Sequence, residues 1–204
     1  MIIFTICAVP LLLLLRIFYL VLIDRGKIPR RSKTVRTLIV LGSGGHTTEM
    51  LRIMNCLDLS KYTPRVYIHA QTDKMSPVKL EALENSRKDW KALAIFRSRE
   101  VGQSYLTSIL TTLIAFFHAI KLLLSEYPDL ILCNGPGTGV PLCLGAFILK
   151  TLFLSRTRII FIESFCRVKT LSLTGKILNF FADHLIVQWP DLCKNNSKYV
   201  HLIK

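Results

Sequence analysis

Acidic side chains are scarce in this sequence of 204 residues, with 13 aspartates and glutamates against 27 lysines and arginines and a formal net charge of +14. Such an excess of positive charge suits a polyanionic partner, either a nucleic acid or an anionic membrane surface. The sequence also lacks a recognisable nucleic-acid-binding motif, and its densest positive run, within residues 24–36, directly follows an apolar segment. We therefore expect the basic residues to face lipid headgroups, and we expect no nucleic acid among the partners.

Closely spaced cysteines are missing as well. The six cysteines are spread over the chain, and no two of them have the Cys-x-x-Cys spacing of a zinc site. A cytosolic domain would keep them reduced, so we interpret them as small buried side chains. The sequence accordingly predicts no metal site and no cofactor, and it contains no internal repeats or low-complexity tracts.

A glycine-rich turn is the strongest functional signal in the chain, although it lacks the hallmarks of two nucleotide-binding motifs. Residues 41–50 read Leu-Gly-Ser-Gly-Gly-His-Thr-Thr-Glu-Met and directly follow an apolar run typical of a buried strand. A dinucleotide fingerprint needs a third glycine where Thr47 stands, and a P-loop needs a lysine where His46 stands. A stand-alone NAD-type enzyme is therefore disfavoured, although Asp73 lies about where a ribose-binding acid would.

The same turn is suited to an anion. Gly44 and Gly45 have no side chains to keep a phosphate away from backbone N–H groups. The helix that follows, which Thr47 or Thr48 can cap, presents the positive end of its dipole. A tight strand-to-helix turn without a ligand is the alternative interpretation.

The first 23 residues are almost entirely apolar. As a helix they would be about 34 Å long at about 1.5 Å per residue, enough to span a bilayer, with Arg16 reaching toward the headgroups. The features of a cleaved signal peptide are missing, and the basic residues that follow place the rest of the chain in the cytosol. We expect a transmembrane anchor at 1–23, a basic juxtamembrane linker at 24–36 and one domain at 37–204. A hydrophobic core helix is the alternative for the first segment.

Strand-like and helix-like patterns alternate through the expected domain. The predicted strands are 38–41, 65–70, 92–96, 130–133, 158–162 and 184–188. The predicted helices between them are 47–57, 77–85, 104–124, 139–154 and 173–181. This alternation predicts an α/β fold, a single Rossmann-like domain with a mostly parallel sheet covered on both faces. Ligands of such sheets bind beyond the carboxyl ends of the strands.

Glycine, polar and basic residues follow the first five predicted strands. These segments are 42–48, 71–76, 97–100, 134–139 and 163–167. Because the strands are expected to be parallel, the five segments should line one edge of the sheet. A polar, basic and glycine-rich edge suits a large anionic ligand.

The long helix expected at 104–124 has two unequal faces. Serines, threonines and His118 gather near one face, whereas large apolar side chains such as Ile109, Leu113 and Phe117 dominate the other. Either the apolar face packs on the sheet, or part of it lies in the cytosolic leaflet. A second membrane span is disfavoured by Lys121 and by the hydroxyl residues of the first half.

Six motifs occur in an order that resembles one known family. They are residues 41–50, Thr-Asp-Lys-Met-Ser at 72–76, Arg-Ser-Arg-Glu-Val-Gly-Gln-Ser at 97–104, Cys-Asn-Gly-Pro-Gly-Thr-Gly-Val-Pro at 133–141, Glu-Ser-Phe-Cys-Arg-Val-Lys-Thr-Leu-Ser at 163–172 and Ile-Val-Gln-Trp-Pro at 186–190. After the anchor, nearly the whole chain is similar to the asparagine-linked glycosylation protein fourteen family. The resemblance implies a subunit that holds a soluble catalytic partner, asparagine-linked glycosylation protein thirteen, at the cytosolic face of the endoplasmic reticulum membrane.

The resemblance also implies a reaction. The pair would transfer N-acetylglucosamine (GlcNAc) from UDP-GlcNAc to lipid-linked GlcNAc-diphosphodolichol, giving the chitobiosyl lipid of the N-glycan precursor. The family is similar to the acceptor half of MurG-type glycosyltransferases, the GT-B enzymes in which two Rossmann-like domains face each other. This chain has room for one such domain, so the enzyme would be split across two chains. A non-catalytic membrane scaffold that only recruits the catalytic partner is the alternative.

Candidate site residues follow from this placement. The expected contacts of the acceptor diphosphate are Gly44, Gly45, Thr47, Arg97 and Arg99. The residues expected at the acceptor sugar or on the donor side are Asn134, Gly135, Gly137 and Thr138. The candidates for removing the proton of the acceptor hydroxyl are His46 and Glu163, with Asp73 as a further alternative.

Overall fold

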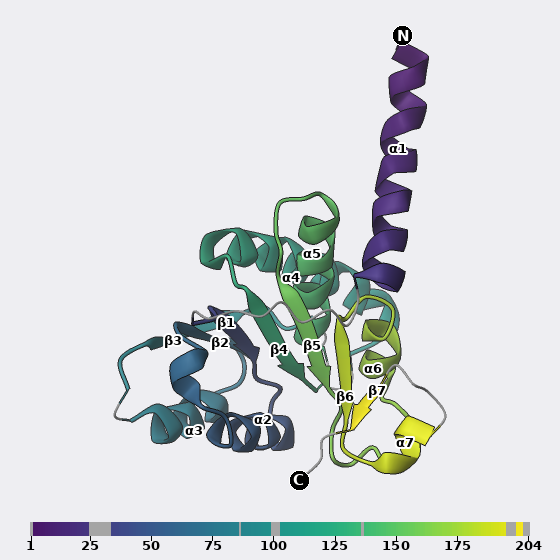
Figure 1. Cartoon of the computed structure of the whole chain (residues 1–204). Helices are drawn as coiled ribbons and strands as arrows, with labels where there is room; N and C mark the ends of the chain where they lie inside the picture. Colours follow the sequence, from purple (N-terminus) through teal and green to yellow (C-terminus); the bar gives the residue numbers. More distant parts are fainter. Residues whose placement is uncertain are drawn as a thin grey trace.

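The computed structural model describes residues 2–24, 34–85, 87–98, 103–135, 137–194 and 199–201. Within them lies one parallel sheet in the order β3-β2-β1-β4-β5-β6-β7 (Figure 1). The strands are β1 (Thr37–Val40), β2 (Arg65–Ala70), β3 (Trp90–Ile95), β4 (Leu130–Asn134), β5 (Arg158–Ile162), β6 (His184–Val187) and β7 (Tyr199–His201). The six predicted strands are confirmed. The prediction missed β7 because three residues are too few to show the hydrophobic pattern of a strand.

Helices cover both faces of the sheet, as predicted. The helical elements are α1 (Ile2–Phe18), the π-helical η1 (Tyr19–Ile23), α2 (Gly45–Asn55), η2 (Leu59–Lys61), α3 (Met75–Glu84), α4 (Tyr105–Glu126), α5 (Gly139–Thr151), α6 (Leu173–Leu178) and α7 (Pro190–Lys194). The core on one face is shared with α2 and α3, and the core on the other face is shared with α4, α5 and α6. The predicted helix 139–154 is three residues too long, since α5 ends at Thr151 and Phe153 has a φ of +61°.

Strand β1 shows how the two cores are built from one short sequence. Leu38 and Val40 point into the core beneath α4 and α5, whereas Ile39 points into the core beneath α2. Side chains alternate along a strand, so a strand covered on both sides must be apolar at every position. All four residues of β1 are accordingly buried.

The amino ends of the strands form one edge of the sheet, called here the amino edge, and the opposite edge is the carboxyl edge. A buried ion pair joins β2 to α3 at the amino edge. Arg65 donates to Glu84 through Nε (2.7 Å) and Nη2 (3.0 Å), and the Tyr67 hydroxyl donates to the same carboxylate at 2.6 Å. Burial opposes the charged form of Glu84, but the hydrogen bonds from Arg65 and Tyr67 hold its pKa below the usual value. The cluster therefore satisfies a charge that has no access to water.

Helix α1 stands away from the domain and meets it only at its carboxyl-terminal end (Figure 1). Just beyond η1, the Asp24 carboxylate lies 3.0 Å from Arg158 Nη1, and Arg158 also contacts Asp183 at 2.7 Å. Lys150 Nζ donates to Asp183 at 2.7 Å. These charges fix the foot of α1 to the start of β5 and the end of α5. Residues 25–33 of the expected basic linker lie outside the described residues.

Helix α4 packs with the opposite face from the one expected to face the sheet. Its buried residues include Ala115, Ala119 and Leu123, and the Thr111 hydroxyl donates to the Ser98 carbonyl at 2.7 Å. The large apolar side chains that remain exposed are Ile109, Leu110, Leu113, Ile114, Phe117 and Leu124. The interpretation that they pack on the sheet is wrong. Among the described side chains, Ser108–Glu126 is also the stretch long and apolar enough to cross a membrane, whereas Ala8–Ile23 forms a shorter apolar helix.

Candidate functional site

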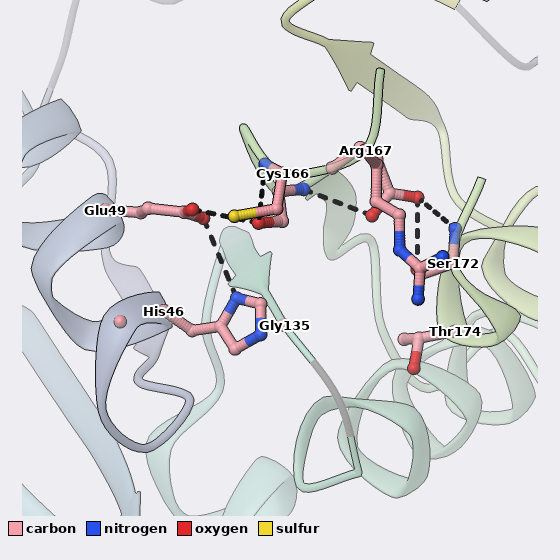
Figure 2. A pocket seen from close by; sticks show the side chains of 10 residues that line it. His46, Glu49, Gly135, Cys166, Arg167, Ser172 and Thr174 are labelled. Atoms are coloured by element: carbon pink, nitrogen blue, oxygen red, sulfur yellow. Dashed lines mark hydrogen bonds and ion pairs between the residues drawn. The ribbon is translucent and has the colours of Figure 1, made fainter. Parts of the chain in front are cut away.

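A cleft of about 330 Å³ opens at the carboxyl edge, where the sheet order reverses between β1 and β4 (Figure 2). It is lined by Gly45, His46, Glu49, Gly135, Glu163, Ser164, Cys166, Arg167, Ser172 and Thr174. These residues come from α2, from the turn after β4, from the loop between β5 and α6 and from the first turn of α6. The position is the usual ligand site of an open parallel sheet, and three of the five predicted segments contribute to it.

The two glycine turns both approach His46 closely. A Cβ atom at Gly42 would lie 2.8 Å from His46 Cβ, and one at Gly135 would lie 2.7 Å from His46 Cγ. Gly135 also has a φ of +86°, which side chains rarely tolerate. Both glycines are therefore required for the imidazole to fit between the turns.

A hydrogen-bond network determines which imidazole nitrogen faces the cleft. His46 Nδ1 lies 3.0 Å from Asn134 Oδ1, and Asn134 Nδ2 donates to Glu49 Oε2 at 3.1 Å. Because a carboxylate can only accept, the amide NH₂ must point to Glu49 and its oxygen to His46. Nδ1 then carries the hydrogen, which leaves Nε2 of a neutral imidazole as an acceptor.

Glu49 connects this network to the opposite wall of the cleft. The Ser164 hydroxyl donates to Glu49 Oε1 at 2.8 Å, and Glu49 Oε2 lies 3.6 Å from His46 Nδ1. The sequence analysis did not single out Glu49, although it lies three residues after His46 and hence on the same face of α2. It placed Ser164, Cys166 and Arg167 at this edge within the segment 163–167 without assigning them a role, and it missed Ser172 and Thr174 as lining residues.

Glu163 lines the cleft, but its carboxylate holds its own loop together. The backbone N–H groups of Ser164 and Ser172 donate to its two oxygens at 3.1 and 2.9 Å, and the Ser172 hydroxyl donates at 3.0 Å. Ser172 in turn caps α6 through a bond from Gly175 N. With its side chain almost fully buried, Glu163 positions the loop that forms one wall of the cleft.

Thr47 and Asp73 are brought together, but behind the first glycine turn rather than in the cleft. The Thr47 hydroxyl donates to the Gly42 carbonyl and contacts the Ser76 hydroxyl, which donates to Asp73 at 2.6 Å. Burial opposes ionisation of Asp73, yet hydrogen bonds from the Ser76 side chain and from backbone N–H groups lower its pKa overall. The predicted capping of α2 by Thr47 or Thr48 is wrong, since the helix begins after Gly44 without a side-chain cap.

The remaining predicted site residues do not all line the cleft. Asn134 is buried, and its amide is taken up by His46 and Glu49. Gly137 and Thr138 do not line the cleft, because the Gly137 carbonyl accepts from Ser98 and the Thr138 side chain is buried. Among the described residues of the second turn, Gly135 is the one that lines the cleft.

Three features supply positive charge near the cleft. Gly44 has a φ of +68° and Gly45 begins α2, whose first N–H groups have no partner within the helix. Arg97 Nη2 donates to Ser43 of the same turn at 3.0 Å, and Arg167 lines the cleft. Arg99 lies outside the described residues. This combination of backbone N–H groups and guanidinium groups suits a phosphate.

The cysteines are less uniform than predicted. Cys133 and Cys143 are buried, but Cys56 and Cys166 are exposed. The interpretation of all six as buried side chains is wrong for these two. Cys166 is exposed because it belongs to the cleft wall.

The strand order and the cleft at its reversal define a Rossmann-like domain. Its fold resembles that of MurG from Acinetobacter baumannii (TM-score 0.53, 16% identity, covering 76% of this chain and 42% of that one). It also resembles a UDP-N-acetylglucosamine 2-epimerase (TM-score 0.59, 18% identity, covering 80% and 46%). The chain therefore spans less than half the length of either protein. It has the fold of one half of a two-domain GT-B protein.

The chain belongs to the family described as "Oligosaccharide biosynthesis protein Alg14 like", whose profile matches residues 37–203. Three similar proteins are named UDP-N-acetylglucosamine transferase subunit ALG14. The mouse protein is 45% identical over 184 residues, covering 85% of this chain and 83% of that protein. The human protein is 43% identical over 204 residues (96% and 93%), and that of Yarrowia lipolytica is 43% identical over 194 residues (92% and 90%). The family resemblance noted in the sequence is confirmed.

Proposed function

We propose that this chain is the membrane-anchoring, acceptor-binding subunit of a two-chain N-acetylglucosaminyltransferase. The reaction adds the second GlcNAc to GlcNAc-diphosphodolichol during synthesis of the N-glycan precursor. The observation that carries the proposal is His46, held between two glycine turns with Nδ1 bonded to Asn134 and its ring on the cleft. A scaffold that only recruits a partner would have no use for an oriented imidazole in a phosphate-suited cleft.

The acceptor diphosphate is proposed to bind at the first glycine turn. Its oxygens would accept from the backbone N–H groups at the start of α2, where Gly44 and Gly45 leave the approach open. Arg97, bonded to Ser43, and Arg167 on the cleft wall lie on two sides of this turn. Guanidinium groups bind phosphate through paired hydrogen bonds. The two arginines would therefore neutralise the charge of the diphosphate and also fix the position of the sugar attached to it.

In the proposed reaction, His46 Nε2 takes the proton of the acceptor hydroxyl. That oxygen forms a bond to C1 of the donor GlcNAc, the bond between C1 and the diphosphate oxygen breaks, and UDP leaves. Glu49 and Asn134 hold the ring with Nε2 available, and Glu49 compensates the charge that the ring gains. Glu163 acts by shaping the cleft wall.

The donor nucleotide is assigned to a separate soluble chain. The protein described here has one Rossmann-like domain, and it covers less than half of the GT-B proteins with the same fold. A soluble catalytic subunit, asparagine-linked glycosylation protein thirteen, would dock over the carboxyl edge. It would bring UDP-GlcNAc to the cleft and so remove much of the entropic barrier between two substrates.

Membrane attachment is proposed to involve both α1 and α4, at the cytosolic face of the endoplasmic reticulum. The Glu126 carbonyl at the end of α4 accepts from Arg36 at the amino edge, whereas Thr111 near its start contacts Ser98 at the carboxyl edge. The exposed apolar face of α4 thus runs from the anchor side to the cleft side. A bilayer along this face would keep the polyprenyl tail in lipid while the diphosphate reaches the cleft.

One reconstitution tests the proposal. The full chain is combined with its soluble partner in vesicles, and transfer to a synthetic GlcNAc-diphospholipid is measured for the parent chain and for His46→Gln. We expect a fall in kcat of about 10²–10⁴-fold with little change in acceptor binding. Unchanged kcat would exclude His46 as the base. A chain that shows no saturable binding of the diphospholipid by itself would favour the scaffold.

A further inference from the structure

The amino edge carries exposed aromatic rings at three neighbouring turns. Tyr127 precedes β4, Phe153 precedes β5 and Phe180 precedes β6, and the three rings are 57%, 72% and 73% exposed. Because β4, β5 and β6 are adjacent in the sheet, these residues form a row, called here the aromatic row. Leu152 and Leu154, on either side of Phe153, are about half exposed and extend its apolar surface.

The row is held in place by specific contacts. The Tyr127 hydroxyl donates to the Leu154 carbonyl at 2.8 Å, which ties two of the three turns together. Tyr127 and Phe153 have φ values of +46° and +61°, and they are the only residues other than glycine with positive φ in the described part of the chain. Bulky side chains rarely adopt this conformation unless surrounding structure requires it. The exposure of these rings is therefore built into the fold.

The row adjoins the foot of the proposed anchor. The Arg16 guanidinium carbon lies 4.3 Å from the centre of the Phe153 ring, and Asp24 is bound to Arg158 at the start of β5. Tyr127 directly follows α4, so the row is also continuous with the exposed apolar face of that helix.

The other half of the amino edge has no such feature in its described residues. The turn before β2 carries Tyr62, which is half-buried, and the strand after the next turn begins with Trp90, whose Nε1 donates to the Arg87 carbonyl. The exposed rings are thus confined to the side on which α1 meets the domain. This distribution relates them to the membrane rather than to the sheet in general.

We propose that the aromatic row inserts into the headgroup boundary of the bilayer beside α1, giving the domain a second attachment. Tyrosine favours this boundary because its ring is apolar and its tip polar, and phenylalanine rings insert beside it on the apolar side of interfacial segments. Exposed Arg156, two residues after Leu154, offers charge to anionic headgroups at the same level. The inference rests on the proposed membrane anchor, because α1 brings the row to the lipid surface.

Depth-dependent fluorescence quenching tests the insertion. The full chain is reconstituted in phosphatidylcholine and phosphatidylserine vesicles with brominated acyl chains, and Phe153→Trp is compared with the parent, which contains Trp90 and Trp189. Val78→Trp is the matched control, because Val78 is 61% exposed on α3, which covers the other face of the sheet. We expect the added quenching to be about twofold greater for Phe153→Trp than for the control.

Phe180→Trp provides a second probe if the backbone at Phe153 does not accept tryptophan, since Phe180 has no positive φ. The inference is overturned if the chain floats with vesicles while both row variants are quenched no more than Val78→Trp; the anchor then stands. A chain that does not float with vesicles overturns the anchor together with the row. Emission that shifts to the blue only when the soluble partner is added would show that the row covers protein, which also overturns the inference.

Discussion

His46 Nδ1 lies 3.0 Å from Asn134 Oδ1, and this bond joins the first turn of α2 to the end of β4. The same amide donates to Glu49, so a single buried side chain sets the tautomer of the histidine and anchors its carboxylate neighbour. The proposed base is therefore oriented by a residue that does not line the cleft.

Replacing Asn134 tests this orientation. In Asn134→Leu the histidine loses its acceptor, so Nδ1 and Nε2 can exchange the hydrogen and the ring can turn. We expect kcat for transfer to fall by about 10- to 100-fold, which is less than the full contribution of about 10²–10⁴-fold from a general base. The KM for UDP-GlcNAc should be unchanged. Steady-state kinetics of the reconstituted pair measure both. Asn55→Leu, at an exposed position on α2, should retain parental kinetics; equal losses in the two variants would refute the role of Asn134.

The two glycine turns predict a contrast between kcat and KM. In Gly135→Ala the new Cβ would lie 2.7 Å from His46 Cγ, at a φ of +86°, so the imidazole must move and kcat should fall by at least about tenfold. In Gly45→Ala nothing lies within 4 Å of the added Cβ, so the fold should be kept while the methyl group hinders the diphosphate and raises the acceptor KM. Acceptor titrations with both variants separate the two effects. The same change in kcat and KM in both variants would contradict the separate roles of the two turns.

The Arg65–Glu84 pair predicts a pH-dependent stability. The pKa of Glu84 is lowered in the folded state, because the hydrogen bonds from Arg65 and Tyr67 outweigh the effect of burial. This stabilisation is therefore present above the ordinary glutamate pKa of about 4.3 and is lost as the pH falls through the lower folded value.

Glu84→Gln should accordingly lower the free energy of unfolding by about 3–5 kcal/mol at pH 7, because Arg65 is left buried without its counter-ion. The difference in the free energy of unfolding between this variant and the parent should become smaller below about pH 4. Thermal unfolding in detergent at several pH values measures it. Glu81→Gln, at an exposed position on the same helix, is the control and should change stability by less than about 0.5 kcal/mol. A pH-independent difference would contradict the assignment.

The exposed face of α4 predicts a dependence on the lipid tail. Leu110→Glu places a charge at a position that is 65% exposed, so it should leave the domain folded but repel the bilayer. We expect kcat/KM to fall by about tenfold with a long-chain acceptor in vesicles and to stay unchanged with a short-chain acceptor in detergent. Val78→Glu, on α3, should affect neither assay. A loss with both acceptors would mean that Leu110 acts through the fold.

Periodicity in the sequence was sufficient to predict the strands of the sheet, but it did not predict which face of α4 is buried. Leu38, Ile39 and Val40 of strand β1 form a continuous apolar run because both faces are covered, and such runs are easily recognised. For α4 the same reasoning left open whether the large apolar residues face the sheet or the lipid, and the structure buries Ala115, Ala119 and Leu123 while most of the larger side chains stay exposed. Helix α4 has an exposed apolar face as well as a buried one, and hydrophobicity alone does not distinguish them.

The cleft lies at the edge of the sheet that the sequence indicated, but which polar side chains line it was predicted only in part. Chain order placed the glycine turns and the loop at 163–172 at one edge, and parallel strands guarantee that outcome. Whether a side chain faces the cleft depends on partners from other segments, such as Ser76 for Thr47 or Ser172 for Glu163. Those partners become neighbours only in the folded chain, so spacing could not identify them.

The salt bridges of Asp24 and Asp183 with Arg158 have a consequence for how the protein moves. If α1 were joined to the domain by a flexible linker, the domain would reorient freely relative to α1. It would then meet each lipid substrate in a different orientation. Here the ion pairs of Arg158 with Asp24 and Asp183 restrain the orientation of the domain relative to α1. With α1 as the proposed anchor, the cleft would keep one distance from the bilayer and one orientation to it, and its search for a lipid substrate would be confined to a plane.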